Sequence, residues 1–229
     1  MANSPDVQRE SIAQDRPRDR TDDAPRVPLT QAERSARTRR RILRAAQELV
    51  ADNGFERASL AAIGARAGYS RGIVTSCFGT KAELLASVVT DSLDRWGHRS
   101  LRPMVGGRVG ADALCAAIDA VRDQARNHPV ELKAFFLLLF EAIGPLPEMK
   151  PRFAEVHRLQ REGIAAWIRA GVTAGSVHAD VDPDAQAALF LSVFRGAMYQ
   201  WLLDPDHIDL DRLFEEQKRN VRRVLQPAS

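Results

Sequence analysis

The sequence predicts an all-α fold with about nine helices. Apolar residues recur three and four positions apart through most of the chain, which is the spacing of one helix face. No segment shows the sustained alternation of apolar and polar residues that a half-buried strand requires. Glycine, proline and capping residues divide the chain into pieces of helical length. Together these observations favour a helical protein without a β-sheet.

The composition is that of a folded globular chain. Its 229 residues are 45% hydrophobic, which is enough for one or two domains with a sizeable core. No stretch of about 18 apolar residues is present, so we expect no membrane span. The N-terminus lacks an apolar run, so we expect no signal peptide and a cytoplasmic location.

Cysteine usage points to no metal or redox chemistry. The two cysteines, Cys77 and Cys115, have a spacing that matches no zinc-binding or redox motif. We expect two buried thiols in a cytoplasmic protein, with no metal site and no cofactor.

Residues 1–32 are predicted to be a disordered arm. They are polar, mixed in charge and interrupted by prolines, including Pro17 and Pro28. Helical signals dominate from Ser35 onward. Ile42 and Leu49 belong to one apolar stripe of a first helix, and arginines lie on another face.

The end of the first helix and two short helices after it are marked by glycine and serine. Asn53-Gly54 predicts a left-handed cap that ends the first helix. Ser59 can cap a second helix, which Gly68 closes. Ser70 can cap a third helix over residues 71–78.

The rest of the chain is predicted to form longer helices. The run Thr80-Lys81-Ala82-Glu83 is a capping box, which opens a fourth helix toward Trp96. A break is predicted over residues 103–110 because of its proline and glycines. Later helices are expected over residues 111–127, 129–143, 151–174, 183–203 and 210–225.

The short helices lie in a basic segment. Residues 34–81 contain ten Lys/Arg against three Asp/Glu, a net charge of +7 in a chain whose net charge is +3. Neutralising phosphates releases counterions and supplies most of the non-specific affinity for nucleic acid. The charge therefore indicates a region that binds polyanions, without indicating which sequence it reads.

The two short helices have the pattern of a helix-turn-helix. This motif needs a tight turn, so that its second helix can enter the major groove of DNA, and Gly68 can supply the positive φ of that turn. Val74 and Phe78 are four residues apart and would face inward, whereas Arg71 and its polar neighbours would face out. The segment 37–85 therefore predicts sequence-specific binding to double-stranded DNA.

The same segment resembles the N-terminal domain of TetR-family transcriptional regulators. The resemblance implies a DNA-binding domain over residues 33–85 and a helical ligand-binding and dimerisation domain over residues 86–229. It also implies a homodimer, a palindromic operator, a small-molecule effector and, by default, repression. The matching residues are Thr38, Arg39, Ile42, Leu43, Ala45, Ala46, Leu49, Gly54, Phe55, Ser59, Leu60, Ile63, Ala67, Gly68, Tyr69, Ser70, Gly72, Val74, Phe78, Lys81, Glu83, Leu84 and Leu85.

The resemblance implies roles for ten residues in DNA binding. Arg71 is the candidate for reading a base edge, since a guanidinium pairs bidentately with guanine. Gly72 allows close approach to the groove, and Ile73 could pack on a thymine methyl group. The other candidates would contact the DNA backbone or the adjacent minor groove: Arg37, Arg39, Ser59, Ser70, Thr75, Ser76 and Lys81.

Three positions depart from the family pattern. Thr75 stands where the family usually has tyrosine, Cys77 where it has histidine or tyrosine, and Ala58 where it has threonine. The usual tyrosine contacts a phosphate, and Thr75 is shorter although its hydroxyl can still donate. These changes affect the expected DNA contacts more than the expected fold.

Apolar and aromatic residues of the later helices predict a pocket for a hydrophobic or amphipathic ligand. For each candidate the alternative is ordinary core packing. The candidates for ligand binding are Trp96, Phe136, Phe140, Ile143 and Trp167.

The helix predicted over residues 183–203 is apolar around most of its circumference. Such a helix must be buried on more than one side, so one side is expected to pack against a second copy of the chain. The candidates for this dimer interface are Phe190, Phe194, Gly196 and Tyr199.

An enzyme and a helical scaffold are the two alternatives to a DNA-binding regulator. The sequence disfavours an enzyme, because it contains no Gly-rich phosphate loop, no GxSxG and no HExxH motif, and we expect no catalytic residue. A helical scaffold or partner-binding module that has lost operator binding stays open, because Thr75 and Cys77 depart from the family pattern. Salt-dependent and sequence-selective retention of DNA would distinguish these classes.

Overall fold

The computed structural model describes residues 30–227, which form helices and connecting turns without a strand. The predicted all-α fold is confirmed for this part of the chain. Most of the predicted arm lies outside the described residues, but its end is helical, because the first helix begins at Gln31 and not near Ser35. The cause is a capping box, in which the Glu33 amide donates to Thr30 Oγ1 (3.2 Å) and the Thr30 amide donates to Glu33 Oε2 (2.7 Å).

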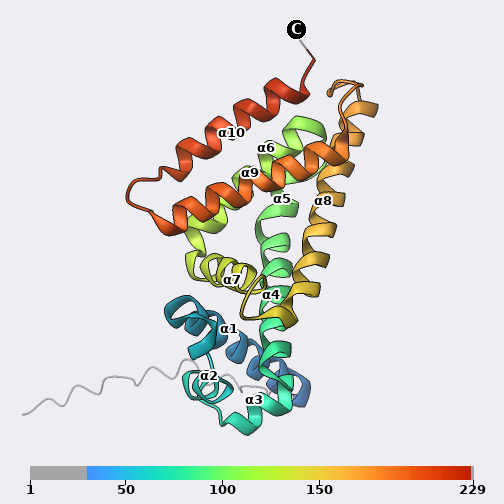
Figure 1. The fold of residues 1–229 in the computed structure, drawn as a ribbon. Helices are drawn as coiled ribbons and strands as arrows, with labels where there is room; N and C mark the ends of the chain where they lie inside the picture. Colours follow the sequence, from blue (N-terminus) through green and yellow to red (C-terminus); the bar gives the residue numbers. More distant parts are fainter. Residues whose placement is uncertain (1–29, 228–229) are drawn as a thin grey trace, which may run out of the picture.

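The N-terminal unit consists of α1 (Gln31–Arg57), α2 (Leu60–Ala67) and α3 (Arg71–Phe78) (Figure 1). The predicted stripe of α1 is its buried face, and Ile42 and Ala46 have no exposed surface. Gly54 interrupts α1 with a φ of 76°, so the first stretch of helix ends where Asn53-Gly54 predicts. A second, short helical stretch follows Gly54 and ends at Arg57, before α2 begins.

The fourth helix is longer than expected. α4 (Lys81–Trp96) continues through a π-helical turn (Gly97–Leu101) into α5 (Arg102–Val105). The break predicted over residues 103–110 therefore begins later than expected, at Gly106, and ends where α6 begins at Gly110. A proline ring crowds the preceding helical turn and lacks an amide hydrogen. The wider π turn, in which the Arg102 amide donates to the Gly97 carbonyl, accommodates that ring.

The remaining helices are α6 (Gly110–Asn127), α7 (Pro129–Glu141), α8 (Lys150–Thr173), α9 (Pro183–Leu203) and α10 (Leu210–Leu225), with a 3-10 turn (Pro147–Met149) before α8. The last two helices have the predicted bounds. α8 packs against α6 and α9, and α10 packs against α6 and α9. Figure 1 shows α9 and α10 at the opposite end of α4 from α2 and α3.

One hydrophobic core joins the N-terminal unit to the later helices. α1 packs against both α4 and α7, and Ile42 in α1 belongs to the same buried cluster as Phe136 in α7 and Phe214 in α10. Burying one large apolar side chain stabilises a fold by roughly 1.5–3 kcal/mol. The two parts are therefore held directly against each other.

Candidate DNA-binding face and effector cavity

The turn between α2 and α3 depends on two glycines. Gly68 adopts φ 76° and ψ 34°, the left-handed conformation that the sequence predicts for it. Gly64 is needed for a different reason, close packing, which the sequence did not reveal. A Cβ at Gly64 would lie 2.8 Å from the Tyr69 carbonyl oxygen, so only glycine lets the turn pack this closely on α2. The two short helices are thereby held in a fixed relation.

Helix α3 has one buried and one exposed face, as predicted. Val74 has no exposed surface and Phe78 is 8% exposed. The opposite face carries small, polar and cationic side chains and includes five of the ten predicted DNA-binding residues. These exposed residues are Arg71, Gly72, Ile73, Thr75 and Ser76.

The two capping serines lie at the N-terminal ends of the same two helices. Ser59 Oγ accepts from the Ala62 amide (3.1 Å), and Ser70 Oγ accepts from the Ile73 amide (3.4 Å). Both serines are exposed. Their hydroxyl hydrogens therefore remain able to donate to a phosphate while their oxygens cap the helices.

Lys81 and Arg39 contact the protein itself. Lys81 Nζ donates to the Glu56 carbonyl oxygen (3.2 Å) and lies 5.0 Å from the centroid of the Phe55 ring. Partial burial lowers the pKa of Lys81, and the charge of Glu56 opposes that shift. Lys81 therefore ties the start of α4 to the end of α1.

Arg39 joins α1 to the end of α3. Its guanidinium donates to the Cys77 carbonyl oxygen (3.3 Å) and to Ser87 Oγ (3.2 Å), and it lies 4.3 Å from the centroid of the Phe78 ring. Arg37 is exposed on the same helix. The predicted DNA-binding set thus contains residues that can reach outward and residues that hold α3 in place.

A cavity of about 380 Å³ lies between α4, the π turn, α6, α8 and α9. Trp96 and Trp167 line it, as predicted for ligand-binding residues. The lining also includes Arg152 and Gln160, which the sequence analysis did not select. We call this space the main cavity.

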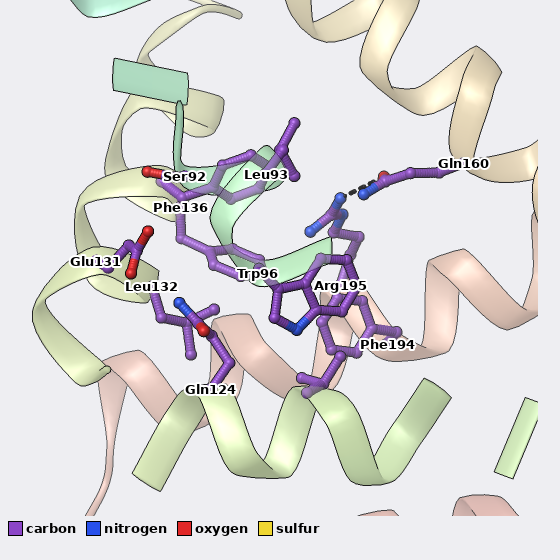
Figure 2. A pocket seen from close by; sticks show the side chains of 12 residues that line it. Ser92, Leu93, Trp96, Gln124, Glu131, Leu132, Phe136, Gln160, Phe194 and Arg195 are labelled. Carbon is purple, nitrogen blue, oxygen red and sulfur yellow. Dashed lines mark hydrogen bonds between the residues drawn. The ribbon is translucent and has the colours of Figure 1, made fainter. Parts of the chain in front are cut away.

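A smaller chamber of about 50 Å³ adjoins the main cavity and is lined by Phe136. Leu93, Trp96, Gln160 and Phe194 line both spaces, so the two lie side by side. Figure 2 shows this chamber, with Arg195 reaching from α9 to Gln160 of α8. The signal that could have identified Arg195 is its position as a charged residue within an otherwise apolar helix.

Two predicted ligand-binding residues lie outside both spaces. Ile143 is 82% exposed, and Phe140 is 38% exposed with its ring packed edge-on against Tyr199 (5.2 Å between centroids). The structure therefore does not bring these two residues to the cavity, because the apolar run of α7 extends past it to the outer surface. Periodicity shows that a residue lies on an apolar helix but not how far the cavity extends along it.

Buried polar groups connect α1 to α4 and α7. The Gln47 side-chain amide donates to Ser92 Oγ (2.7 Å), and Arg95 donates to Gln47 Oε1 (3.1 Å). Arg95 and Arg99 also donate to the two carboxylate oxygens of Glu131 (2.9 and 2.8 Å). Ser92 and Glu131 line the small chamber, so this network reaches from the chamber to the N-terminal unit.

Exposed apolar side chains lie on both α9 and α10. Leu189 is 57% exposed and Val193 is 47% exposed on α9, and Val224 is 48% exposed on α10. A groove of about 290 Å³ between the two helices is lined by Gly196, one of the predicted interface residues.

The other predicted interface residues differ in position. Tyr199 is 47% exposed. Phe190 and Phe194 are half-buried and line both the groove and the main cavity. Phe194 also stacks on Phe214 (6.5 Å between centroids), so its ring contributes to the protein's own core.

Residues 30–227 show neither a metal site nor a single membrane-spanning helix. No cluster of His, Cys, Asp and Glu in this range has the arrangement of a metal site. No single helix of this range is long and apolar enough to cross a membrane. Only the bent pair Arg71–Phe78 and Lys81–Val105 meets the length and composition test, at an angle of 66°.

Two family profiles match the chain. The profile described as "Bacterial regulatory proteins, tetR family" matches residues 42–88. The profile described as "BetI-type transcriptional repressor, C-terminal" matches residues 110–226. No curated protein matches the chain in sequence.

Many solved structures share the fold. A TetR transcriptional regulator from Chloroflexus aurantiacus is 20% identical, with a TM-score of 0.74 over 85% of this chain and 99% of that one. SmeT of Stenotrophomonas maltophilia, solved with triclosan, is 21% identical, with a TM-score of 0.72 over 84% and 93% of the two chains. A putative regulator from Saccharomonospora viridis, solved with choline, is 19% identical, with a TM-score of 0.70 over 84% and 100%.

Proposed function

Because the chain belongs to the TetR family of bacterial regulatory proteins, we propose that it is a ligand-responsive repressor in the cytoplasm. It binds a palindromic DNA operator as a homodimer. A small hydrophobic or amphipathic effector releases it from that operator. The exposed face of α3, held on a closely packed turn, is the observation that carries this proposal.

The α3 face is suited to reading DNA. Arg71 lies in the first turn of α3, where the free amides and the helix dipole also favour a phosphate nearby. A guanidinium there can pair bidentately with guanine, and the hydroxyls of Thr75 and Ser76 can donate to the DNA backbone. Lys81 and Arg39 support this function by fixing α3 against its neighbours.

The outer face of α9 and α10 is suited to pairing with a second copy. Both helices carry exposed apolar side chains, and the groove at Gly196 lies between them. A two-fold axis through this face would put both α3 helices on one side of the dimer. Paired reading helices require two half-sites in inverted orientation, which is a palindrome.

The main cavity is the proposed effector site. Its lining is largely apolar with a few polar groups, which is typical of small-molecule sites. SmeT and the Saccharomonospora viridis regulator were solved with small molecules, which supports a ligand for this chain.

The proposed link between effector and operator is α4. This helix begins next to α3, and its Leu93 and Trp96 line the cavity. The Gln47–Ser92–Arg95–Glu131 network connects the same part of α4 to α1. An effector changes operator affinity only if it binds the DNA-bound and free conformations with different affinity.

Selection of bound sites from random double-stranded DNA tests this proposal. The expected result is a palindrome whose half-sites are about one helical turn, roughly 34–36 Å, or a multiple apart. Binding that falls steeply with salt but shows no sequence preference would contradict it. That outcome would favour the alternative, a helical scaffold that has lost operator binding.

The variant Arg71→Ala provides the site-specific test. We expect it to weaken binding to the selected operator by roughly 1–3 kcal/mol and to relax the preference at one base pair of each half-site. The control is Arg158→Ala, which removes an exposed arginine of α8 far along the chain from the helix-turn-helix. An unchanged affinity and footprint in Arg71→Ala would contradict its assignment as a base-reading residue.

A further inference from the structure

Arg195 is a half-buried cation without an acidic partner among residues 30–227. No ion pair to Arg195 is formed there, and its Nε is buried without a hydrogen-bond partner. The Nη2 of Arg195 donates to Gln160 Oε1 (2.7 Å). Burying a charge costs several kcal/mol unless it is paired, so this arrangement needs a reason.

The surrounding groups stabilise the charge only in part. The guanidinium carbon lies 5.2–5.3 Å from the ring centroids of Phe135, Phe136 and Phe194. Aromatic faces attract a cation, but each contributes only about 0.5–2 kcal/mol. Burial lowers the pKa of Arg195 to about 10, so the side chain remains positive at neutral pH.

Nearby titratable groups do not supply a negative charge. Burial, together with Arg195 and Arg161, lowers the pKa of His157 to about 4, so this imidazole is neutral at pH 7. Glu131 lines the small chamber, but its two oxygens accept from Arg95 and Arg99. Figure 2 shows Glu131 and Arg195 on opposite sides of the chamber.

This unpaired cation lies in the small chamber beside the main cavity. Arg195 lines the small chamber, whose volume of about 50 Å³ exceeds the roughly 10–15 Å³ that one water needs. The adjoining main cavity is predominantly apolar. A second arginine, Arg152, lines the main cavity and also has a buried Nε without a partner. The acidic residue of that lining, Asp94, is exposed.

We propose that the effector is an organic acid, whose carboxylate pairs with Arg195 in the small chamber and whose apolar body fills the main cavity. This inference rests on the proposed function, because it concerns the same effector site. The carboxylate would accept from the Arg195 guanidinium and supply the missing negative charge. Arginine suits this role because its planar guanidinium matches the geometry of a carboxylate.

The first experiment uses the unmodified protein and matched probes. Calorimetric titration compares decanoate, methyl decanoate and decyltrimethylammonium, and fluorescence of Trp96 and Trp167 reports whether each enters the cavity. A second acid, 2-naphthoate, tests an aromatic body, and choline tests a small cation. We expect decanoate or 2-naphthoate to bind roughly tenfold or more tightly than the neutral ester and the cations.

The second experiment changes Arg195. Arg195→Met keeps the side chain long but removes its charge, and we expect a loss of roughly tenfold or more in affinity for the acid, with no change for the ester. Arg195→Lys should retain part of the preference for the acid, since it keeps the positive charge. The control is Arg169→Gln, which removes an exposed arginine of α8 that pairs with Asp184.

The outcomes separate this inference from the proposed function. Failure of both acids to bind, tighter binding of the ester or of either cation, or unchanged acid binding in Arg195→Met would each overturn the inference. If choline or the ester instead released the protein from its selected operator, the ligand-responsive repressor would stand without an acidic effector. If the acid bound through Arg195 but no operator could be selected, the repressor proposal would fail and the acid site would stand.

Discussion

Arg39 and Lys81 are two cations predicted to contact DNA. They show that a place in the basic segment does not tell which groups a side chain contacts. Both carry charge in the basic segment, but both donate to backbone carbonyls and lie over aromatic rings. Arg71 has the same charge and is exposed, without such a contact to residues 30–227. Net charge therefore indicates the region, and only the contacts separate the residues that support α3 from those proposed to read DNA.

Gly72 offers the sharpest test of close approach to DNA. A Cβ there would meet only Ser70 Oγ, at an ordinary 3.7 Å, so Gly72→Ala fits the folded protein. Alanine is favoured over glycine in a helix by about 1 kcal/mol, so we expect an equal or higher melting temperature. We also expect the affinity for the selected operator, measured by fluorescence anisotropy, to fall by roughly tenfold or more.

The contrasting variant is Gly64→Ala. Its Cβ would lie 2.8 Å from the Tyr69 carbonyl oxygen. We therefore expect this variant to lower the melting temperature, which Gly72→Ala should not do. If Gly72→Ala bound the operator as tightly as the unchanged protein, α3 would not approach the groove at this position.

His157 makes stability depend on pH. Its pKa falls from 6.5 to about 4, mainly through burial, so the unfolded chain binds a proton between these values that the folded chain does not. The free energy of unfolding should therefore decrease as the pH falls from 6.5 toward 4. In urea titrations, His157→Gln should reduce this slope. Equal slopes for the unchanged protein and His157→Gln would contradict this role.

Among the helices, α4 shows what local signals can and cannot specify. The capping box at Thr80 predicts its start, and the structure confirms both hydrogen bonds of that box. The end predicted from Pro103 is wrong, because a π turn accommodates the proline and the helix continues to Val105. A cap depends on neighbours in sequence, whereas the π turn also packs against α6.

The ion pairs of Glu131 are predicted to matter more than those on the surface. Glu131→Gln would leave Arg95 and Arg99 without their common carboxylate. We expect a loss of roughly 1–3 kcal/mol in the free energy of unfolding, less than for a fully buried pair, because the two arginine side chains are 39% and 35% exposed. Urea denaturation measures this loss.

The matched control is Glu155→Gln, since Glu155 pairs with Arg158 on the exposed side of α8. An exposed pair contributes about 0–1 kcal/mol, so this variant should be nearly neutral. A comparable loss in the two variants would mean that the network around Glu131 has no special structural role.

The assembled molecule explains why α9 is apolar on nearly every side. Its inner residues line the cavity and the core, and its outer residues, such as Leu189 and Val193, are exposed. We expect Val193→Glu, on that outer face, to shift the protein toward a monomer in sedimentation-velocity measurements. Its operator affinity should fall in parallel, because each monomer reads one half-site.

Ala154→Glu is the control for this variant, since it adds the same charge to an exposed position of α8. It should leave both the sedimentation coefficient and the operator affinity unchanged. If Val193→Glu remained dimeric and bound DNA normally, the α9–α10 face would not be the dimer interface.

Helix type, most helix ends and the inward face of α3 follow from the chain itself. They depend on interactions within a few residues, such as caps, turn glycines and the period of one helix face. The bounds of α9 and α10 and the burial of Val74 and Phe78 were predictable for this reason. The cavity was not: Trp96 and Trp167 meet there from different helices, while Phe140 and Ile143 lie on the surface. The unpaired charge of Arg195 depends likewise on which side chains several distant helices bring to it, and no local pattern encodes that arrangement.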